Sequence, residues 1–328
     1  MFPKSRVDGV AGRCGVSRDD VVWCYRTLLR REPESEAVVK DQMVHESLRA
    51  LVHAFVESRE FQQMKGARAF HPIPLPTARI DVRLDQGQLA AAIAKVKAAW
   101  SHLGRVRPHY SVLTHEEYLP ENLPRAIDMF WKTGEAEAAR VFGVLEAHGV
   151  EAEGKTCIEY GCGVGRVTSG LAQRFQHVHA YDISPGHLGE AEKRIQSIGM
   201  QNVSLVLCSD SFLQDLQPCD VFYSRIVFQH NPPPLIDALV RAALRSLRPG
   251  GIAIFQVPTY AVGYSFDIDE WLQSPESLEM EMHCLPQPHI FQAIAEAKCL
   301  ALEVREDGST GDGRFISTTF VVRRPQAS

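Results

Sequence analysis

The chain has 328 residues, of which 45% are hydrophobic and 23% are charged, a composition typical of a folded globular protein. Its formal net charge of -5 does not favour a nucleic-acid binder, because such proteins usually carry a basic stripe. We expect no membrane span and no secretory signal, since no apolar run has the required length. The eight cysteines form no Cys-x-x-Cys pair, which favours a reduced, cytoplasmic protein without disulfides.

Residues 1–65 are expected to form a small helical domain at the N-terminus. From Ser17 onward, apolar residues recur at spacings of three and four, and Ser17 itself is a candidate N-cap. Pro33 is expected to end the first helix, because proline cannot continue a helix interior. Further helices are predicted from near Ser35 and from near Glu46.

A proline-rich linker is predicted at residues 66–85, where alternating prolines favour a stiff, extended chain. Residues 86–150 are expected to form a helical lid or cap. Within it, a helix with one apolar stripe is followed by a predicted loop at residues 104–116. Gly134 is expected to divide the helical run at residues 124–149 into two helices, because glycine weakens a helix interior.

The most informative stretch runs from Cys157 to Val167. It predicts a short strand, a glycine-rich turn and the start of a helix, a place where a ligand lies against bare backbone amides. A dinucleotide-binding turn requires a third glycine where Arg166 stands, so that fingerprint is absent. The pattern is instead Glu-x-Gly-x-Gly-x-Gly, which begins at Glu159.

This pattern resembles the first motif of the class I S-adenosylmethionine (SAM)-dependent methyltransferases. The run Leu247-Arg248-Pro249-Gly250-Gly251, which precedes a predicted strand, is a second feature of that family. The resemblance implies that residues 151–328 form a SAM-binding methyltransferase domain. It also implies an α/β fold with a Rossmann-like, seven-stranded sheet that ends in an antiparallel hairpin.

The residues themselves also predict this class of fold. Strands and helices alternate with short connections after residue 154, which favours a parallel sheet covered on both faces. A short glycine-rich loop joins the last two strands, which are therefore expected to be antiparallel. The predicted strands are residues 155–160, 177–181, 203–208, 220–225, 252–257, 300–306 and 316–323.

Two carboxylates follow successive predicted strands. Asp182 lies about twenty residues beyond the first glycine of the turn, the distance at which a carboxylate reaches a nucleoside ribose. Its alternative role is to cap the next helix, for which Ser184 is better placed. In the resembled family an acid after the third strand binds adenine, which implies this role for Asp210, with a helix cap as the alternative.

The resemblance implies a set of cofactor-binding residues from the turn, the ends of the next strands and the lid. They are Glu159, Tyr160, Gly161, Cys162, Gly163, Gly165, Asp182, Ile183, Ser209, Asp210, Ser211, Phe212, Ser224, Arg225 and Tyr110. For Tyr110, ordinary core packing is the competing interpretation.

Methyl transfer requires a nucleophile held in line with the departing sulfur, and a hydroxyl nucleophile also benefits from a base. His230, just beyond the fourth strand, is the first candidate for this base, and His283 is the second. Each has a structural alternative as a hydrogen-bonded histidine. Asp267, Asp269 and Glu270 are interpreted as acids at a helix start rather than Mg²⁺ ligands, so no metal site is predicted.

A second resemblance concerns the N-terminal helices. The segments Tyr25–Pro33 and Ser58–Phe61 resemble a small bacterial helical domain of unassigned function that accompanies proteins of glycan assembly. A domain of this kind is either a packing cap or a docking module for a protein partner.

The two resemblances together favour O-methylation of a small molecule or of a sugar or polysaccharide precursor. The alternatives are a non-catalytic scaffold with this fold, an N-methyltransferase for a small-molecule or protein acceptor, and a nucleotide-linked dehydrogenase. The position of Arg166 and the predicted hairpin disfavour the dehydrogenase.

Overall fold

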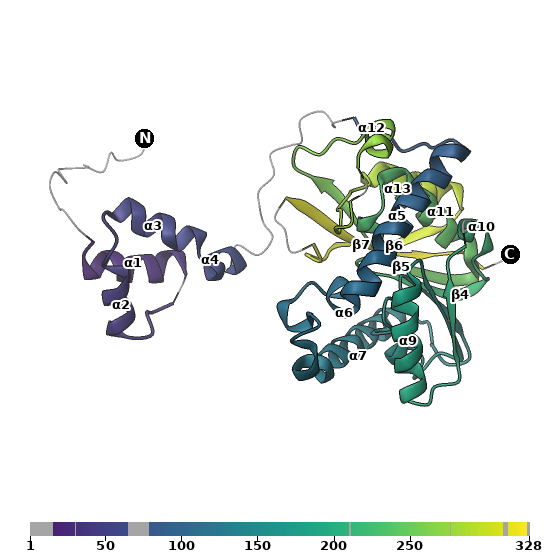
Figure 1. Ribbon diagram of the computed structural model, residues 1–328, viewed down its shortest axis with the longest axis horizontal. Helices are drawn as coiled ribbons and strands as arrows, with labels where there is room; N and C mark the ends of the chain where they lie inside the picture. The colour runs from purple at the N-terminus through teal and green to yellow at the C-terminus, as the bar shows by residue number, and fades with distance from the viewer. Residues whose placement is uncertain are drawn as a thin grey trace. The chain divides into compact units, whose positions relative to one another are not determined.

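A computed structural model describes most of the chain, which divides into two units, residues 1–74 and 75–328 (Figure 1). The described residues are 16–29, 31–64, 79–209, 211–275, 277–310 and 314–326. Each unit has a hydrophobic core of its own. Among the helices in the described ranges, none combines the length with the apolar character that crossing a bilayer requires.

The described part of the smaller unit is helical, as predicted. Its helices are α1 (Arg18–Leu28), α2 (Glu36–Gln42), α3 (Leu48–Glu57) and α4 (Arg59–Met64). The side chains of Ser17, Ser35 and Ser47 cap the first three by accepting backbone N–H groups. The first helix ends at Leu28, earlier than Pro33. Tyr25 packs edge-on against Phe55 in the core, with ring centroids 4.9 Å apart.

The larger unit is built on a seven-stranded mixed sheet of order β3-β2-β1-β4-β5-β7-β6. The strands are β1 (Thr156–Tyr160), β2 (His177–Asp182), β3 (Val203–Leu207), β4 (Cys219–Ser224), β5 (Leu247–Ala261), β6 (Leu300–Glu306) and β7 (Phe315–Arg323). The first five strands are parallel to one another, and β7 is antiparallel to both β5 and β6. The predicted parallel sheet with an antiparallel hairpin is confirmed, although β5 starts five residues earlier than residue 252.

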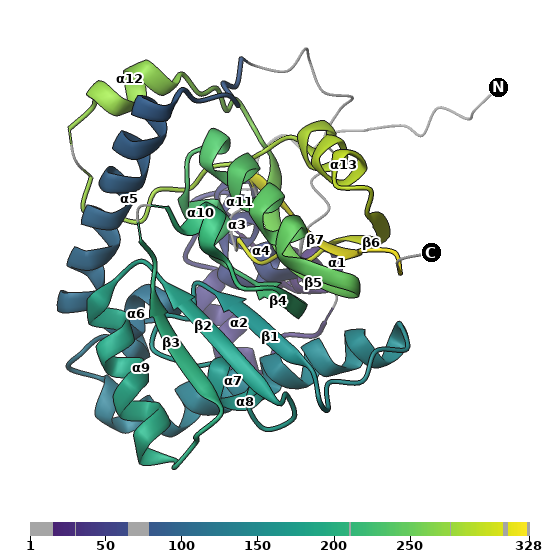
Figure 2. The same cartoon turned by 90° about the vertical axis from the view of Figure 1, so that its right-hand side faces the viewer.

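Helices cover both faces of this sheet (Figure 2). The helices of the larger unit are α5 (Gln86–Val106), α6 (Pro108–Val112), α7 (Leu123–Ala147), α8 (Thr168–Leu171), α9 (Pro185–Ser197), α10 (Phe212–Asp215), α11 (Pro233–Ser246), α12 (Ile268–Gln273) and α13 (Gln287–Glu296), with short 3-10 turns η1 (Glu116–Tyr118) and η2 (Phe228–His230). In Figure 2, α10, α11 and α13 lie on one side of the sheet, and α7, α8 and α9 lie on the other.

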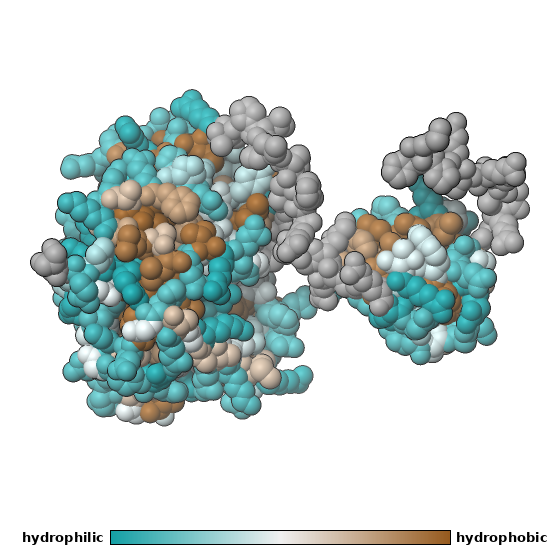
Figure 3. All heavy atoms as spheres, turned by 180° about the vertical axis from the view of Figure 1, so that it is seen from behind, coloured by the Kyte–Doolittle hydropathy of each residue, from teal (hydrophilic) through white to brown (hydrophobic). Residues whose placement is uncertain are grey.

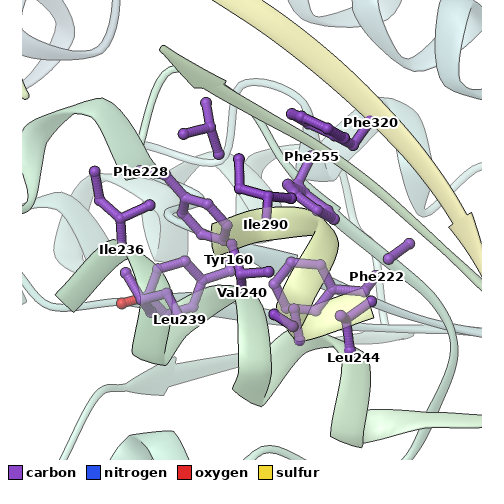
Figure 4. Close-up of a cluster of buried hydrophobic side chains, with 14 of the residues drawn as sticks. Tyr160, Phe222, Phe228, Ile236, Leu239, Val240, Leu244, Phe255, Ile290 and Phe320 are labelled. Atoms are coloured by element: carbon purple, nitrogen blue, oxygen red, sulfur yellow. The ribbon is translucent and has the colours of Figure 1, made fainter. Parts of the chain in front are cut away.

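Successive side chains along a strand point to opposite faces of the sheet, so the hydrophobic core is divided between the two faces. On β4, Phe222 belongs to the cluster under α11 and α13, whereas its neighbours Val221 and Tyr223 belong to the cluster under α7. Figure 4 shows the first cluster, in which the rings of Phe255 and Phe320 are stacked with centroids 5.5 Å apart. Both faces of the sheet are therefore buried over much of their area, as expected for parallel strands.

The prediction that Gly134 divides a helix is wrong, because α7 continues through it. A Cβ atom at this position would lie 1.9 Å from the carbonyl oxygen of Arg166. The glycine therefore permits close packing of α7 on the turn after β1, and does not end the helix. The contact joins residues far apart in sequence, so helix propensity alone could not reveal it.

The predicted loop at residues 104–116 is also largely wrong. Helix α5 continues to Val106, and α6 and the start of η1 occupy much of the remainder. A Cβ atom on Gly104 would lie 2.2 Å from Oγ of Ser184, so this glycine brings the end of α5 onto the start of α9. Close packing therefore explains why a glycine stands near the end of this helix.

Strand β6 forms one edge of the sheet and exposes the side chains of Leu300 and Val304. Figure 3 shows that apolar residues gather over part of the larger unit on the side opposite to the view of Figure 1. The other edge strand, β3, ends at the exposed Leu207. Backbone groups along such edges are free to pair with a further strand.

Candidate functional site

A cleft lies at the carboxyl ends of β1, β2 and β4, the point in an open α/β sheet where ligands bind. The empty space in it is about 860 Å³ when the space open to solvent is included. The turn after β1 forms its floor, and Trp100 of α5 and Val112 of α6 contribute further walls. Segments distant in sequence therefore meet at one site.

The glycine turn has the backbone conformation that its residues allow. Gly161, Gly163 and Gly165 have φ angles of +77°, +55° and +80°, which other residues adopt only with strain. A Cβ atom on Gly161 would lie 2.3 Å from Val227, and one on Gly163 would lie 2.5 Å from Val112. Two valine side chains therefore cover the floor of the cleft in this conformation.

Asp182 ends β2 and holds the turn in place. Its Oδ2 atom accepts the backbone N–H of Gly163 at 2.8 Å, and its Oδ1 atom accepts the N–H of Ser184 at 2.8 Å. Ser184 caps α9 through its side chain, as predicted. A carboxylate offers about four acceptor sites, so Asp182 keeps acceptor capacity toward the cleft that it lines.

Glu159 lies on β1 beneath the turn and is 3% exposed. Burial raises the pKa of its carboxyl group to about 8, against the opposing effects of the Thr168 hydrogen bond and the charge of Arg166. Thr168 donates its hydroxyl to Oε2 of Glu159 at 2.6 Å. At neutral pH this acid is therefore largely protonated, and a cation placed beside it would favour its ionised form.

Arg225 follows β4 and is paired with Glu137 of α7. Tyr223 also donates its hydroxyl to Glu137 at 3.0 Å, and Arg140 donates to it at 2.8 Å. Burial opposes ionisation of Glu137, but Arg225 and these hydrogen bonds hold its pKa below the ordinary value. The charge of Arg225 is thus compensated within the protein.

Sequence reasoning missed several residues of this cleft, among them Trp100, Ser111, Arg166 and His187. The Oγ atom of Ser111 lies 2.8 Å from Nε2 of His187. Burial lowers the pKa of His187, which favours its neutral form at physiological pH. The signal in the sequence for Arg166 is its position directly after the third glycine of the turn, which places it close to the cleft.

The structure brings together eight of the residues predicted to bind the cofactor. The cleft is lined by Glu159, Tyr160, Gly161, Cys162, Gly163, Asp182, Ile183 and Arg225. Asp210 lies outside the described residues, and Phe212 is described only as the first residue of α10.

The other predicted cofactor residues do not line the cleft. Gly165 packs against Ala191 of α9, and Ser224 donates its hydroxyl to the carbonyl of Tyr160 at 2.9 Å. Tyr110 is half-buried on α6. Ser209 and Ser211 are exposed, and their hydroxyl groups lie 3.2 Å apart.

His230 lies beside the cleft, in a small pocket that shares Trp100 with it. Its ring centroid is 5.0 Å from that of Trp100. Its Nδ1 atom lies 2.8 Å from the carbonyl of Glu281, and its Nε2 atom lies 3.2 Å from Nε2 of Gln229. Burial lowers the pKa of His230 to about 4, so the ring is neutral at physiological pH.

His283 is buried, and both of its ring nitrogens have partners. Nδ1 lies 2.8 Å from the hydroxyl of Tyr264, and Nε2 lies 3.2 Å from Oε2 of Glu281. Asp267 caps α12 by accepting the N–H groups of Asp269 and Glu270, which is the structural interpretation favoured for these acids.

Comparison with known proteins defines the class of this domain. Residues 157–251 match the family model described as a methyltransferase domain. The chain therefore contains a methyltransferase domain, built on the seven-stranded sheet that the resemblance to class I enzymes implied.

The individual relatives match only in part. A ubiquinone biosynthesis O-methyltransferase from Azoarcus sp. (strain BH72) is 32% identical over 104 residues, which are 31% of this chain and 43% of that protein. The enzyme of the same name from Methylococcus capsulatus is 31% identical over 113 residues, 34% of this chain and 46% of that protein. The matched segment thus spans less than half the length of both relatives.

Among solved structures, 1,6-didemethyltoxoflavin-N1-methyltransferase from Burkholderia thailandensis is similar, with a TM-score of 0.49 and 18% identity. The similarity covers 78% of this chain and 99% of that chain.

Proposed function

We propose that the chain is a SAM-dependent methyltransferase that methylates a hydroxyl group of a small molecule. One observation carries the proposal: the cleft brings the glycine turn, Glu159 and Asp182 together at the carboxyl ends of neighbouring strands. The match of residues 157–251 to a methyltransferase domain supports the reaction class. The names of the two O-methyltransferase relatives support oxygen as the methyl acceptor.

The cleft residues fit such a cofactor. The glycine turn allows the adenosyl and methionine parts to lie on backbone atoms, and Asp182 offers acceptor sites for ribose hydroxyls. When bound, SAM supplies an electrophilic methyl group. The protein's task is then to bind and orient both partners and to exclude water.

Residues 86–150 are proposed as the lid of this site, because Trp100 and Val112 lie against the cleft. Val112 covers Gly163, so a ligand seated on that glycine requires movement of α6. His230 and His283 remain candidate bases. A proton transfer by either one requires that one of its present hydrogen bonds be broken.

The first test is calorimetry with SAM and with its product, S-adenosylhomocysteine. We expect both to bind with a stoichiometry of one per chain, and the product to inhibit methyl transfer. Binding of neither ligand would contradict the proposal and favour a non-catalytic scaffold. Radiolabelled methyl transfer to phenolic, sugar and amine acceptors then separates O- from N-methylation.

The acceptor class is proposed from the N-terminal segments. The resemblance of the N-terminal segments to a domain that accompanies glycan-assembly proteins favours a sugar or polysaccharide precursor. The same domain is proposed as a docking module for a protein partner. Deletion of residues 1–65 tests this role. We expect the SAM affinity to stay unchanged and the binding of the protein partner to be lost. A reduced SAM affinity would contradict the docking role.

A further inference from the structure

The side chain of Arg166 has an unusual position in the cleft. It follows the third glycine of the turn, lines the cleft and is 9% exposed. Helix α7 holds it in place, because Gly134 lets the helix backbone approach: a Cβ atom there would lie 2.9 Å from Cγ of Arg166. The guanidinium group is therefore buried and confined, and is not a flexible surface charge.

This guanidinium group has few partners. Its Nη1 atom donates to Oγ1 of Thr133 at 3.2 Å, and its buried Nε atom has no hydrogen-bond partner. Within the part of the chain that the structure describes, it makes no ion pair. A charge buried without a counterion is costly, so such groups are normally paired.

A second arginine, Arg225, also lines the cleft and differs from Arg166 in its partners. Arg225 is paired with the buried Glu137, whereas Arg166 is not. Two acids influence Arg166 electrostatically, Glu137 and Glu159. Glu137 is already paired with Arg225 and Arg140, and Glu159 accepts from Thr168 and is largely protonated at neutral pH. The protein thus leaves one positive charge in the cleft for an anion from outside.

An unpaired Nε atom by itself does not identify a site. Arg194 and Arg323 also have one, but neither lines the cleft. The guanidinium carbon of Arg194 lies 4.4 Å from the ring centroid of Trp131, and Arg323 donates to the carbonyl of His148. The combination of burial, the missing counterion and a place in the cleft is what distinguishes Arg166.

We propose that Arg166 binds the carboxylate at the amino-acid end of the cofactor, an assignment that rests on the proposed function. A guanidinium group offers a planar fork of donors that matches the two oxygens of a carboxylate. The neighbouring Glu159 is placed to receive the ammonium group of the same end. The amino-acid part of the cofactor would then be bound by one acidic and one basic side chain, Glu159 and Arg166.

Calorimetry with two ligands tests this assignment without any methyl acceptor. SAM has the carboxylate, whereas decarboxylated SAM keeps the adenosyl, sulfonium and ammonium groups and lacks it. We expect the wild-type protein to bind SAM about 10- to 100-fold more tightly than decarboxylated SAM, the scale of hydrogen bonds to a charged group. In Arg166→Gln this preference should disappear, with little change for decarboxylated SAM.

Arg194→Gln is the matched control, because it removes an arginine with an unpaired Nε outside the cleft. It should keep the wild-type preference. If Arg166→Gln does not fold, Arg166→Lys keeps the charge but not the fork, and should retain only part of the preference. Equal losses for both ligands, or an unchanged preference in the folded variant, would overturn the assignment. Failure of the wild-type protein to bind SAM would instead refute the proposed function.

Discussion

The backbone N–H of Gly163 donates to Oδ2 of Asp182 across 2.8 Å, which fixes the glycine turn after β1 to the end of β2. The other carboxylate oxygen accepts the N–H of Ser184 at the start of α9. One side chain thus positions both the floor of the cleft and the helix beside it. This relationship makes Asp182 the first target for substitution.

Asp182→Ala should weaken cofactor binding by about 1.5–3 kcal/mol, because it removes hydrogen bonds to a charged acceptor. Titration calorimetry with S-adenosylhomocysteine measures the change. Asp237→Ala is the control, since Asp237 pairs with Arg241 on α11 and does not line the cleft. Unchanged affinity in Asp182→Ala would remove this residue from the cofactor site.

The raised pKa of Glu159 predicts how the free energy of unfolding depends on pH. Its pKa in the folded protein is about 8, above the ordinary value of 4.5, so the folded state binds more protons than the unfolded state between these values. The contribution of Glu159 to the free energy of unfolding therefore falls as pH rises through this window, by up to about 5 kcal/mol.

Glu159→Gln should remove that part of the pH dependence. Urea unfolding of both proteins at several pH values between 5 and 9 gives the comparison, with the variant becoming relatively more stable at the alkaline end. Identical pH profiles would show that Glu159 does not titrate as described. If SAM binding places its ammonium group beside Glu159, the wild-type protein should release a proton on binding near pH 7 and this variant should not.

Helix α7 contains two glycines with opposite surroundings. Gly134→Ala should destabilise the protein by about 1–3 kcal/mol, because its Cβ atom would collide with the backbone of Arg166. Gly143→Ala should stabilise it by about 0.5–1 kcal/mol, because that position is exposed and helical, with no atom within 4 Å of the added Cβ. Thermal unfolding of the pair measures both effects, and equal effects would contradict the packing described for α7.

Ile226 has a φ angle of +59°, which is strained for a β-branched residue, and it lines the cleft. Its N–H donates to Oε1 of the buried Gln256 at 2.9 Å, and Gln256 in turn donates to Gln229 and Ser317. Gln256→Leu should lower the free energy of unfolding by about 1–3 kcal/mol, because it leaves buried polar groups unpaired. Chemical denaturation provides the measurement.

The exposed Gln292 on α13 serves as the control for that substitution. Gln292→Leu should change the free energy of unfolding by no more than about 0.5 kcal/mol. If Gln256→Leu were equally mild, the amide network would not be what maintains the backbone of Ile226.

Much of the fold could be predicted because its signals are local. Short apolar runs that alternate with helical segments predicted the strands, Ser184 and Pro185 predicted the start of α9, and the glycine-rich loop predicted the hairpin between β6 and β7. Of the site, the turn and Asp182 were recognised, because glycine spacing and a strand-end acid are visible along the chain. Trp100 and Ser111 were missed, because only folding brings α5 and α6 to the cleft.

By itself, the sequence determined the order of strands and helices and the position of the glycine turn, since backbone preferences and burial period act between near neighbours. The tertiary structure decided what each ambiguous residue does. Gly134 admits a neighbouring backbone instead of ending a helix, and Arg166 is buried without an ion pair to any residue that the structure describes. The close approach at Gly134 and the confinement of the Arg166 side chain both come from one contact between α7 and the turn after β1. These segments are distant in sequence, so their packing leaves no periodic pattern in the sequence from which it could be predicted.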